Sequence, residues 1–96
     1  MEFPFAEDPK EAVIVCKHVY EGTRPILFAI RHIEDGMWHF SCGNAHDSRD
    51  RRFITLQEVY DKDRSIKELK DLQPGSYAIR SGEGEEWIIR EIISLD

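Results

Sequence analysis

The sequence contains only two cysteines, Cys16 and Cys42, among its 96 residues. Small disulfide-stabilised domains carry several cysteine pairs, so two cysteines do not indicate a disulfide framework. The opening residues, MEFPFAEDPKEA, show neither the basic segment nor the apolar segment of a secretory signal peptide. We therefore expect a cytoplasmic protein in which both cysteines are reduced thiols.

Basic residues are also in short supply, with 13 Lys and Arg against 19 Asp and Glu, for a formal net charge of -6. Nucleic-acid binding depends on clustered cations that neutralise phosphates. The single basic cluster, residues 49–52, contains Asp50 and lies close to Asp47. The composition thus predicts no nucleic-acid partner, and an acidic surface would suit a basic protein partner.

Long apolar runs are absent, since no segment approaches the roughly 20 apolar residues that a membrane-spanning helix needs. The sequence therefore predicts no association with a membrane. Its hydrophobic content of 41% and aromatic content of 10% are enough for a folded core. A chain of this length is expected to form one domain, residues 1–96.

The first half of the chain has the pattern of strands and turns. Residues 12–20, 26–33 and 37–42 are rich in β-branched and aromatic side chains. Gly22 and Pro25 separate the first two segments, and Asp35-Gly36, a strong hairpin signal, separates the second from the third. This pattern predicts a three-stranded antiparallel meander.

The two turns suggest a register, in which Ile30 faces Phe40 across the second turn and Cys16 faces Ile30 across the first. Because side chains alternate along a strand, the even-numbered residues then share one face, which we expect to be the core. A slip of one residue in either turn would exchange the two faces. The expected core residues are Ile14, Cys16, His18, Ile26, Phe28, Ile30, His32, Trp38, Phe40 and Cys42.

The second half begins with two short helices, predicted at residues 56–61 and 66–72. Each starts with a capping box, Thr55 with Glu58 and Ser65 with Glu68. Residues 76–80 read as a strand, and residues 87–95, which also fit a helix, are expected to pair with it. The predicted fold class is α+β, with an antiparallel sheet of four to five strands, beginning with the meander, and two short helices packed on one face.

Cysteine and histidine provide the sharpest candidate chemistry, because Cys16, His18, Cys42 and His46 could bind zinc or form a thiol–imidazole pair. In the expected register, however, a whole strand lies between Cys16 and Cys42, which places the sulfurs about 10 Å apart. That distance is too long for one metal ion or a disulfide. The sequence therefore assigns no metal ligand, cofactor or catalytic residue. A small metal- or thiol-dependent protein remains the alternative.

Four motifs, V-C-K-H-V, P-I-L-F-A-I-R, D-G-M-W-H-F-S-C-G and L-K-D-L-Q-P-G-S-Y-A-I-R, occur in this order within residues 12–87. In this respect the chain resembles a family of small bacterial domains that are regarded as predicted immunity proteins of polymorphic toxin systems. The resemblance implies a non-enzymatic domain that neutralises a toxin by stoichiometric binding. It transfers no catalytic residues.

An acidic surface would attract a basic toxin domain, and buried aromatic contacts would then hold the complex. The expected contact residues are Asp35, His39, Glu83, Glu85 and Glu86. The odd-numbered face of the meander is partly apolar, so it offers a possible homodimer surface.

Overall fold

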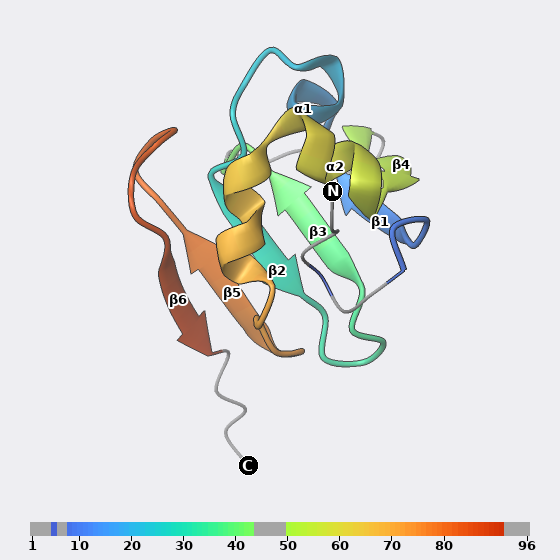
Figure 1. The fold of residues 1–96 in the computed structure, drawn as a ribbon, viewed down its shortest axis with the longest axis vertical. Helices are drawn as coiled ribbons and strands as arrows, with labels where there is room; N and C mark the ends of the chain where they lie inside the picture. The colour runs from blue at the N-terminus through green and yellow to red at the C-terminus, as the bar shows by residue number, and fades with distance from the viewer. Residues whose placement is uncertain (1–4, 6–7, 44–49, 92–96) are drawn as a thin grey trace.

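Six strands form one sheet in the computed structural model of the chain, with the spatial order β4-β1-β3-β2-β5-β6 (Figure 1). The structure describes residues 5, 8–43 and 50–91. The strands are β1 (Ala12–Val15), β2 (Phe28–Arg31), β3 (Trp38–Ser41), β4 (Arg52–Thr55), β5 (Ser76–Ile79) and β6 (Ile88–Glu91). The helices are α1 (Lys17–Glu21), α2 (Leu56–Lys62) and the 3-10 helix η2 (Arg64–Leu69).

The first strand is shorter than expected, because β1 ends at Val15 and α1 follows almost at once. Cys16 caps this helix with its sulfur, which accepts a hydrogen bond from the backbone N–H of Val19 at 3.5 Å. Gly22 ends the helix in the left-handed conformation, with φ 77°, and its N–H bonds back to the helix. The prediction of a continuous strand over residues 12–20 was therefore wrong after Val15.

The neighbour of β1 also differs from the prediction. β1 pairs in parallel with β3, with Ile14 beside His39 and Val15 beside Phe40, and its other edge pairs antiparallel with β4. Two parallel strands need a crossover connection, and α1 with the loop after it carries the chain across to β2. The antiparallel β2–β3 hairpin was predicted correctly, but the three-stranded meander was wrong because β3 lies between β1 and β2.

The hairpin register differs from the prediction by one residue, since Phe40 lies opposite Ala29 and Trp38 opposite Arg31. Gly36 adopts φ 71° in the turn, and the N–H of His32 bonds to the carbonyl of Met37 at 3.0 Å. This hydrogen bond closes the strands one residue earlier than expected. Phe28, Ile30 and His32, expected beside Trp38 and Phe40, consequently belong to the opposite face.

The helical half follows the sequence prediction more closely. The capping box at the start of α2 is present, with the Thr55 hydroxyl 3.1 Å from the N–H of Glu58 and the Glu58 carboxylate 3.2 Å from the N–H of Thr55. The second capping box was wrong, because the N-cap of η2 is Asp63, whose carboxylate accepts from the N–H of Ser65. The predicted inward residues of both helices are buried: Leu56, Val59, Tyr60, Ile66, Leu69 and Leu72.

The last two strands extend the sheet beyond the predicted four to five strands. β5 pairs antiparallel with β2 and with β6, which confirms a strand at residues 76–80 and its pairing with the segment after Trp87. The remainder of the predicted segment, residues 92–95, lies outside the described residues. The α+β class is confirmed, with a sheet that is antiparallel except for the β1–β3 pair.

Helices α2 and η2 cover one face of the sheet and enclose the core (Figure 1). Trp38 stacks on Phe40 with ring centroids 5.4 Å apart, and the Phe5 ring meets it edge-on at 5.6 Å. Among the described helices, none is long and apolar enough to cross a membrane.

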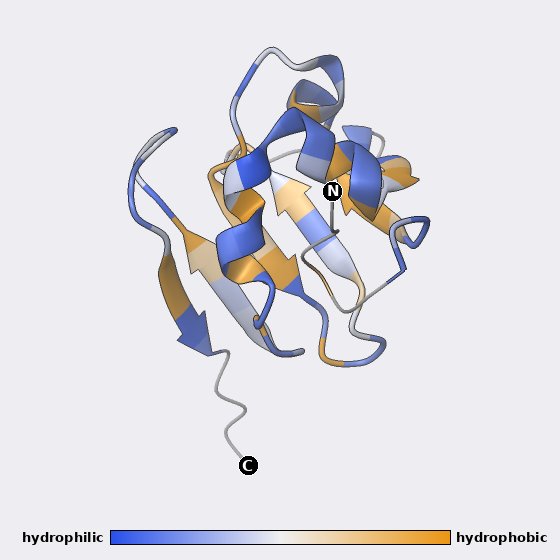
Figure 2. Cartoon of the chain, in the orientation of Figure 1, coloured by the Kyte–Doolittle hydropathy of each residue, from blue (hydrophilic) through white to orange (hydrophobic). Residues whose placement is uncertain are grey.

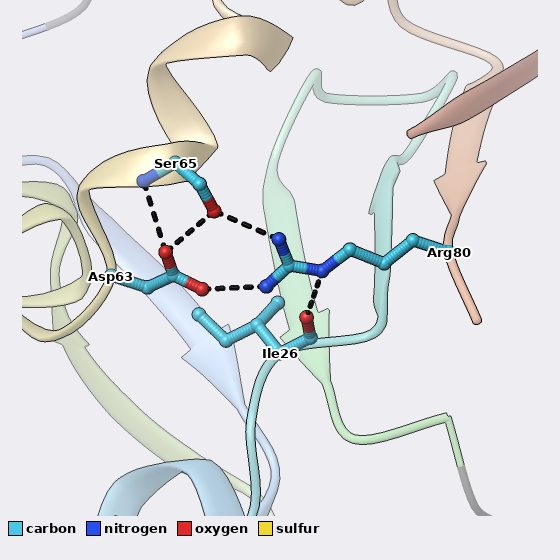
Figure 3. Close-up of polar contacts among 4 residues, drawn as sticks. All are labelled: Ile26, Asp63, Ser65 and Arg80. Carbon is cyan, nitrogen blue, oxygen red and sulfur yellow. Dashed lines mark hydrogen bonds and ion pairs between the residues drawn. The ribbon is translucent and has the colours of Figure 1, made fainter. Parts of the chain in front are cut away.

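A buried ion pair connects the helical layer to the sheet (Figure 3). The Arg80 side chain is 1% exposed and lies 2.7 Å from the Asp63 carboxylate. The guanidinium also donates to the carbonyl of Ile26 and to the hydroxyl of Ser65, each at 2.9 Å. These contacts join the end of β5, the loop before β2 and the start of η2.

Replacement of Asp63 by alanine is expected to destabilise the protein by about 3–5 kcal/mol, because it leaves the Arg80 guanidinium buried without its carboxylate. It also removes the cap of η2. Urea denaturation followed by circular dichroism would measure the free energy of unfolding. The matched control is Asp61→Ala, since Asp61 and Arg64 form a pair whose side chains are 54% and 51% exposed. Loss of such an exposed pair costs about 0–1 kcal/mol, so equal effects of the two substitutions would contradict the prediction.

Candidate metal centre

Three potential metal ligands meet at one end of the sheet. The ligand atoms of Cys16, His18 and Cys42 all lie within 4.8 Å of one another. Cys16 follows β1, His18 lies in the first turn of α1, and Cys42 follows β3. Because β1 and β3 are parallel neighbours, their C-terminal ends lie side by side at one end of the sheet. The residues that follow the two strands therefore lie close together.

The backbone holds Cys16 firmly in this cluster. Its N–H donates to the carbonyl of Phe40 at 3.2 Å, which continues the parallel pairing by one residue. Its sulfur accepts from the N–H of Val19 as the cap of α1. The residue is 1% exposed, so its position is set by the strand, the helix and the core together.

His18 and Cys42 complete the cluster from two different elements. The Cys42 sulfur lies 3.8 Å from Nδ1 of His18. Cys42 is 4% exposed, while the imidazole is half-buried. The cluster therefore lies at the boundary between the core and solvent, and a small ion could reach it from the side of His18.

Burial raises the pKa of the Cys16 thiol above its ordinary value, and the neighbouring Cys42 thiol raises it further. The hydrogen bond from Val19 opposes the shift but does not reverse it. In the metal-free protein this thiol is therefore protonated at neutral pH. A reactive cysteine needs the opposite shift, so Cys16 does not have the electrostatics of a thiol nucleophile.

The spacing of the cluster suits a tetrahedral metal ion. Zinc–sulfur bonds of about 2.3 Å and zinc–nitrogen bonds of about 2.0 Å place two sulfurs of a tetrahedral site about 3.8 Å apart and a sulfur and a nitrogen about 3.5 Å apart. The Cys42 sulfur and Nδ1 of His18 are 3.8 Å apart, and no two ligand atoms of the cluster are more than 4.8 Å apart. A bound zinc ion would also deprotonate both thiols.

The structure overturns the sequence argument against this site. The expected separation of about 10 Å assumed that β2 lay between the two cysteine-bearing strands. Cys16 and Cys42 instead follow adjacent strands. The sequence did contain one signal for the helix that follows Cys16, because Gly22 is a residue type typical of helix ends and it stands directly after α1. His46, the fourth candidate, lies outside the described residues.

The expected protein-contact residues do not form one group. Asp35 is exposed in the β2–β3 turn, and His39 is half-buried on β3. Glu83, Glu85 and Glu86 are exposed in the turn between β5 and β6. β5 runs antiparallel to β2, so that turn lies at the end of the sheet opposite Asp35. A single small contact surface cannot include both turns.

The raised pKa of Cys16 predicts low thiol reactivity in the folded, metal-free protein. At pH 7 we expect iodoacetamide to modify both cysteines roughly tenfold or more slowly than in the urea-unfolded chain. The rate for Cys16 should rise with pH as the thiolate forms. Mass spectrometry after timed alkylation in the presence of EDTA would measure both rates. Rapid modification of folded protein at pH 7 would contradict the assignment of a buried thiol.

No protein-family model, curated protein or solved structure matches this chain. The resemblance to predicted immunity proteins therefore stays a prediction from the sequence. Within the described part of the chain, the cluster formed by Cys16, His18 and Cys42 is the only group of three or more converging His, Cys, Asp or Glu side chains.

Proposed function

We propose that this protein binds a transition-metal ion, preferentially Zn²⁺, through Cys16, His18 and Cys42. The observation that carries the proposal is the convergence of their three ligand atoms within 4.8 Å. Thiolate and imidazole donors favour zinc and other transition metals, while Ca²⁺ and Mg²⁺ take oxygen ligands. The ligand chemistry therefore selects the class of ion.

Within the described part of the chain three ligands converge, which leaves one position of a tetrahedral zinc ion. Zinc sites with three protein ligands hold a water molecule or another exchangeable group at that position. The half-buried imidazole of His18 makes the site accessible at its solvent side. We therefore propose a metal site that solvent can reach, and we assign it no catalytic step.

Metal binding would also strengthen the tertiary structure, because the three ligands come from the end of β1, from α1 and from the end of β3. A ligand that binds only the folded state stabilises it by about 2.7 kcal/mol at a free concentration of 100 times the dissociation constant. The metal would therefore hold the crossover helix against the strand that it spans.

Titration of the reduced, EDTA-treated protein with Zn²⁺ is expected to show one binding site and a raised melting temperature. Substitutions of the three ligands, Cys16→Ala, His18→Ala and Cys42→Ala, should each weaken binding by more than the roughly 10–100-fold that loss of an outer-shell partner costs. Isothermal titration calorimetry would measure the affinity. Co²⁺ absorption would report tetrahedral coordination and thiolate ligation.

The matched control is His39→Ala, which removes another half-buried histidine from β3 and leaves the cluster intact. Its zinc affinity should equal that of the unmodified chain. Folded, reduced protein that binds no zinc, or binds it equally well without Cys42, would rule out this site.

We propose stoichiometric binding of a basic protein as a second function. The observation that favours it is the turn between β5 and β6, where Glu83, Glu85 and Glu86 are all exposed. Clustered charge of one sign speeds the encounter with a partner of opposite sign. A toxin domain of the kind that the resemblance implies would be such a partner.

Substitution of all three glutamates by glutamine is expected to slow association with a basic toxin encoded by a neighbouring gene by about tenfold at low salt. Stopped-flow or surface plasmon resonance would measure the association rate constant. Asp35→Asn, at the opposite end of the sheet, is the control and should change that rate little. If the two variants behave alike, the turn is not the contact surface.

A further inference from the structure

The side chains of the edge strand β6 are exposed to solvent on both faces of the sheet. Within the described residues it pairs only with β5, and all four of its residues are exposed. Ile88 and Ile89 point to opposite faces of the sheet and are 48% and 51% exposed. At the other edge of the sheet, β4 is exposed on one face only, since Phe53 is 66% exposed while Ile54 is 8% exposed. Figure 2 shows the apolar first half of β6 at the margin of the molecule.

The hydrogen bonds of β5 determine which backbone groups of β6 face outward. The N–H of Arg80 donates a hydrogen bond to the carbonyl of Leu27, in the loop before β2. Backbone groups alternate in direction along a strand, so the N–H and C=O groups of Ala78 and Ser76 also point toward β2. The backbone N–H and C=O groups of Tyr77 and Ile79 therefore point toward β6, where these residues pair with Arg90 and Ile88. The N–H and C=O groups of Ile89 and Glu91 consequently point away from the sheet, where they can bond to a further strand.

We propose that a second copy of this chain occupies this edge, with the two β6 strands antiparallel about a two-fold axis at Ile89. The two sheets then form one continuous sheet. Residues that face each other across the axis must lie on the same side of the sheet, so the axis must pass through a residue and not between two residues. Ile88, Ile89 and Arg90 are the possible centres.

Charge and the extent of β6 together select Ile89 among these centres. An axis at Arg90 would place two arginines directly opposite each other. An axis at Ile88 would place Glu86 opposite Arg90 but also Glu91 opposite Glu85, and Ile88 would then be the only residue of β6 paired with the other β6 strand. An axis at Ile89 places Ile88 opposite Arg90, with Glu86 of the other copy diagonal to Arg90 and within reach of its long side chain. The two Ile89 residues then form the central hydrogen-bonded pair.

The dimer also covers the exposed isoleucines. Ile79 is 40% exposed beside Ile88 on the face of the sheet away from the helices. The second strand would bury part of both residues and, on the helical side, part of Ile89. A single added strand buries less than the roughly 800 Å² per partner of a stable interface. We therefore expect a weak dimer, with a dissociation constant in the range of roughly 10–500 μM.

Cysteine cross-linking tests both the dimer and its register. In Ile89→Cys the two introduced residues would have Cα atoms about 5.5 Å apart, a distance that a disulfide spans. In the matched control Ile88→Cys the corresponding atoms would be about 8 Å apart, beyond that limit. Oxidation of both variants and of the unmodified chain at about 200 μM, followed by non-reducing electrophoresis, would measure cross-linking. We expect it to be at least about tenfold faster for Ile89→Cys than for the other two.

Sedimentation velocity of the reduced, unmodified chain provides the second measurement. A sedimentation coefficient that rises with concentration and falls to the monomer value in Ile89→Lys is the expected result, with circular dichroism confirming that the variant is folded. A strict monomer at about 1 mM would overturn the dimer. Equal cross-linking of the two cysteine variants, or faster cross-linking of Ile88→Cys, would overturn the register.

Discussion

The parallel pairing of β1 with β3 is the constraint on which the rest of this structure depends. Adjacent parallel strands cannot be joined by a tight turn, so the chain must leave the sheet after β1 and return on the far side of β3. α1 begins this crossover, and Gly22 ends the helix so that the loop can lead to β2. The same pairing sends the residues after both strands to one end of the sheet. The convergence of Cys16 and Cys42 is thus a direct result of strand order.

The cluster occupies an unusual position with respect to the core. Cys16 and Cys42 belong to the buried hydrophobic cluster, while His18 reaches the half-buried boundary. Two thiols in such a place serve as small apolar side chains when they are protonated. A metal ion would convert them to thiolates and add a bond between the strands and the crossover helix.

Local chemistry predicted those elements that depend on neighbours in sequence. The Asp35-Gly36 turn, the capping box at Thr55 and the inward faces of both helices were all correct because each rests on contacts within a few residues. The cap at the start of η2 was not predicted, since Asp63 serves both as N-cap and as the partner of Arg80. The ion pair with Arg80 thus favours Asp63 over Ser65 as the residue that caps the helix. Likewise, Cys16 follows a run of β-branched residues, so the sequence places it within a strand. It becomes a helix cap because the chain leaves the sheet at this point.

By itself, the sequence determined the α+β class, the β2–β3 hairpin and the start of α2. Alternation and capping are properties of short segments, so these features could be derived without knowledge of distant contacts. Only the tertiary structure decided the order of the strands, the register of the hairpin and the meeting of Cys16, His18 and Cys42. The physical reason is that the residues of a strand do not specify which other strand will pair with it. Its partner is chosen by the burial of a whole face and by the path of the crossover, which involve residues far apart in the chain.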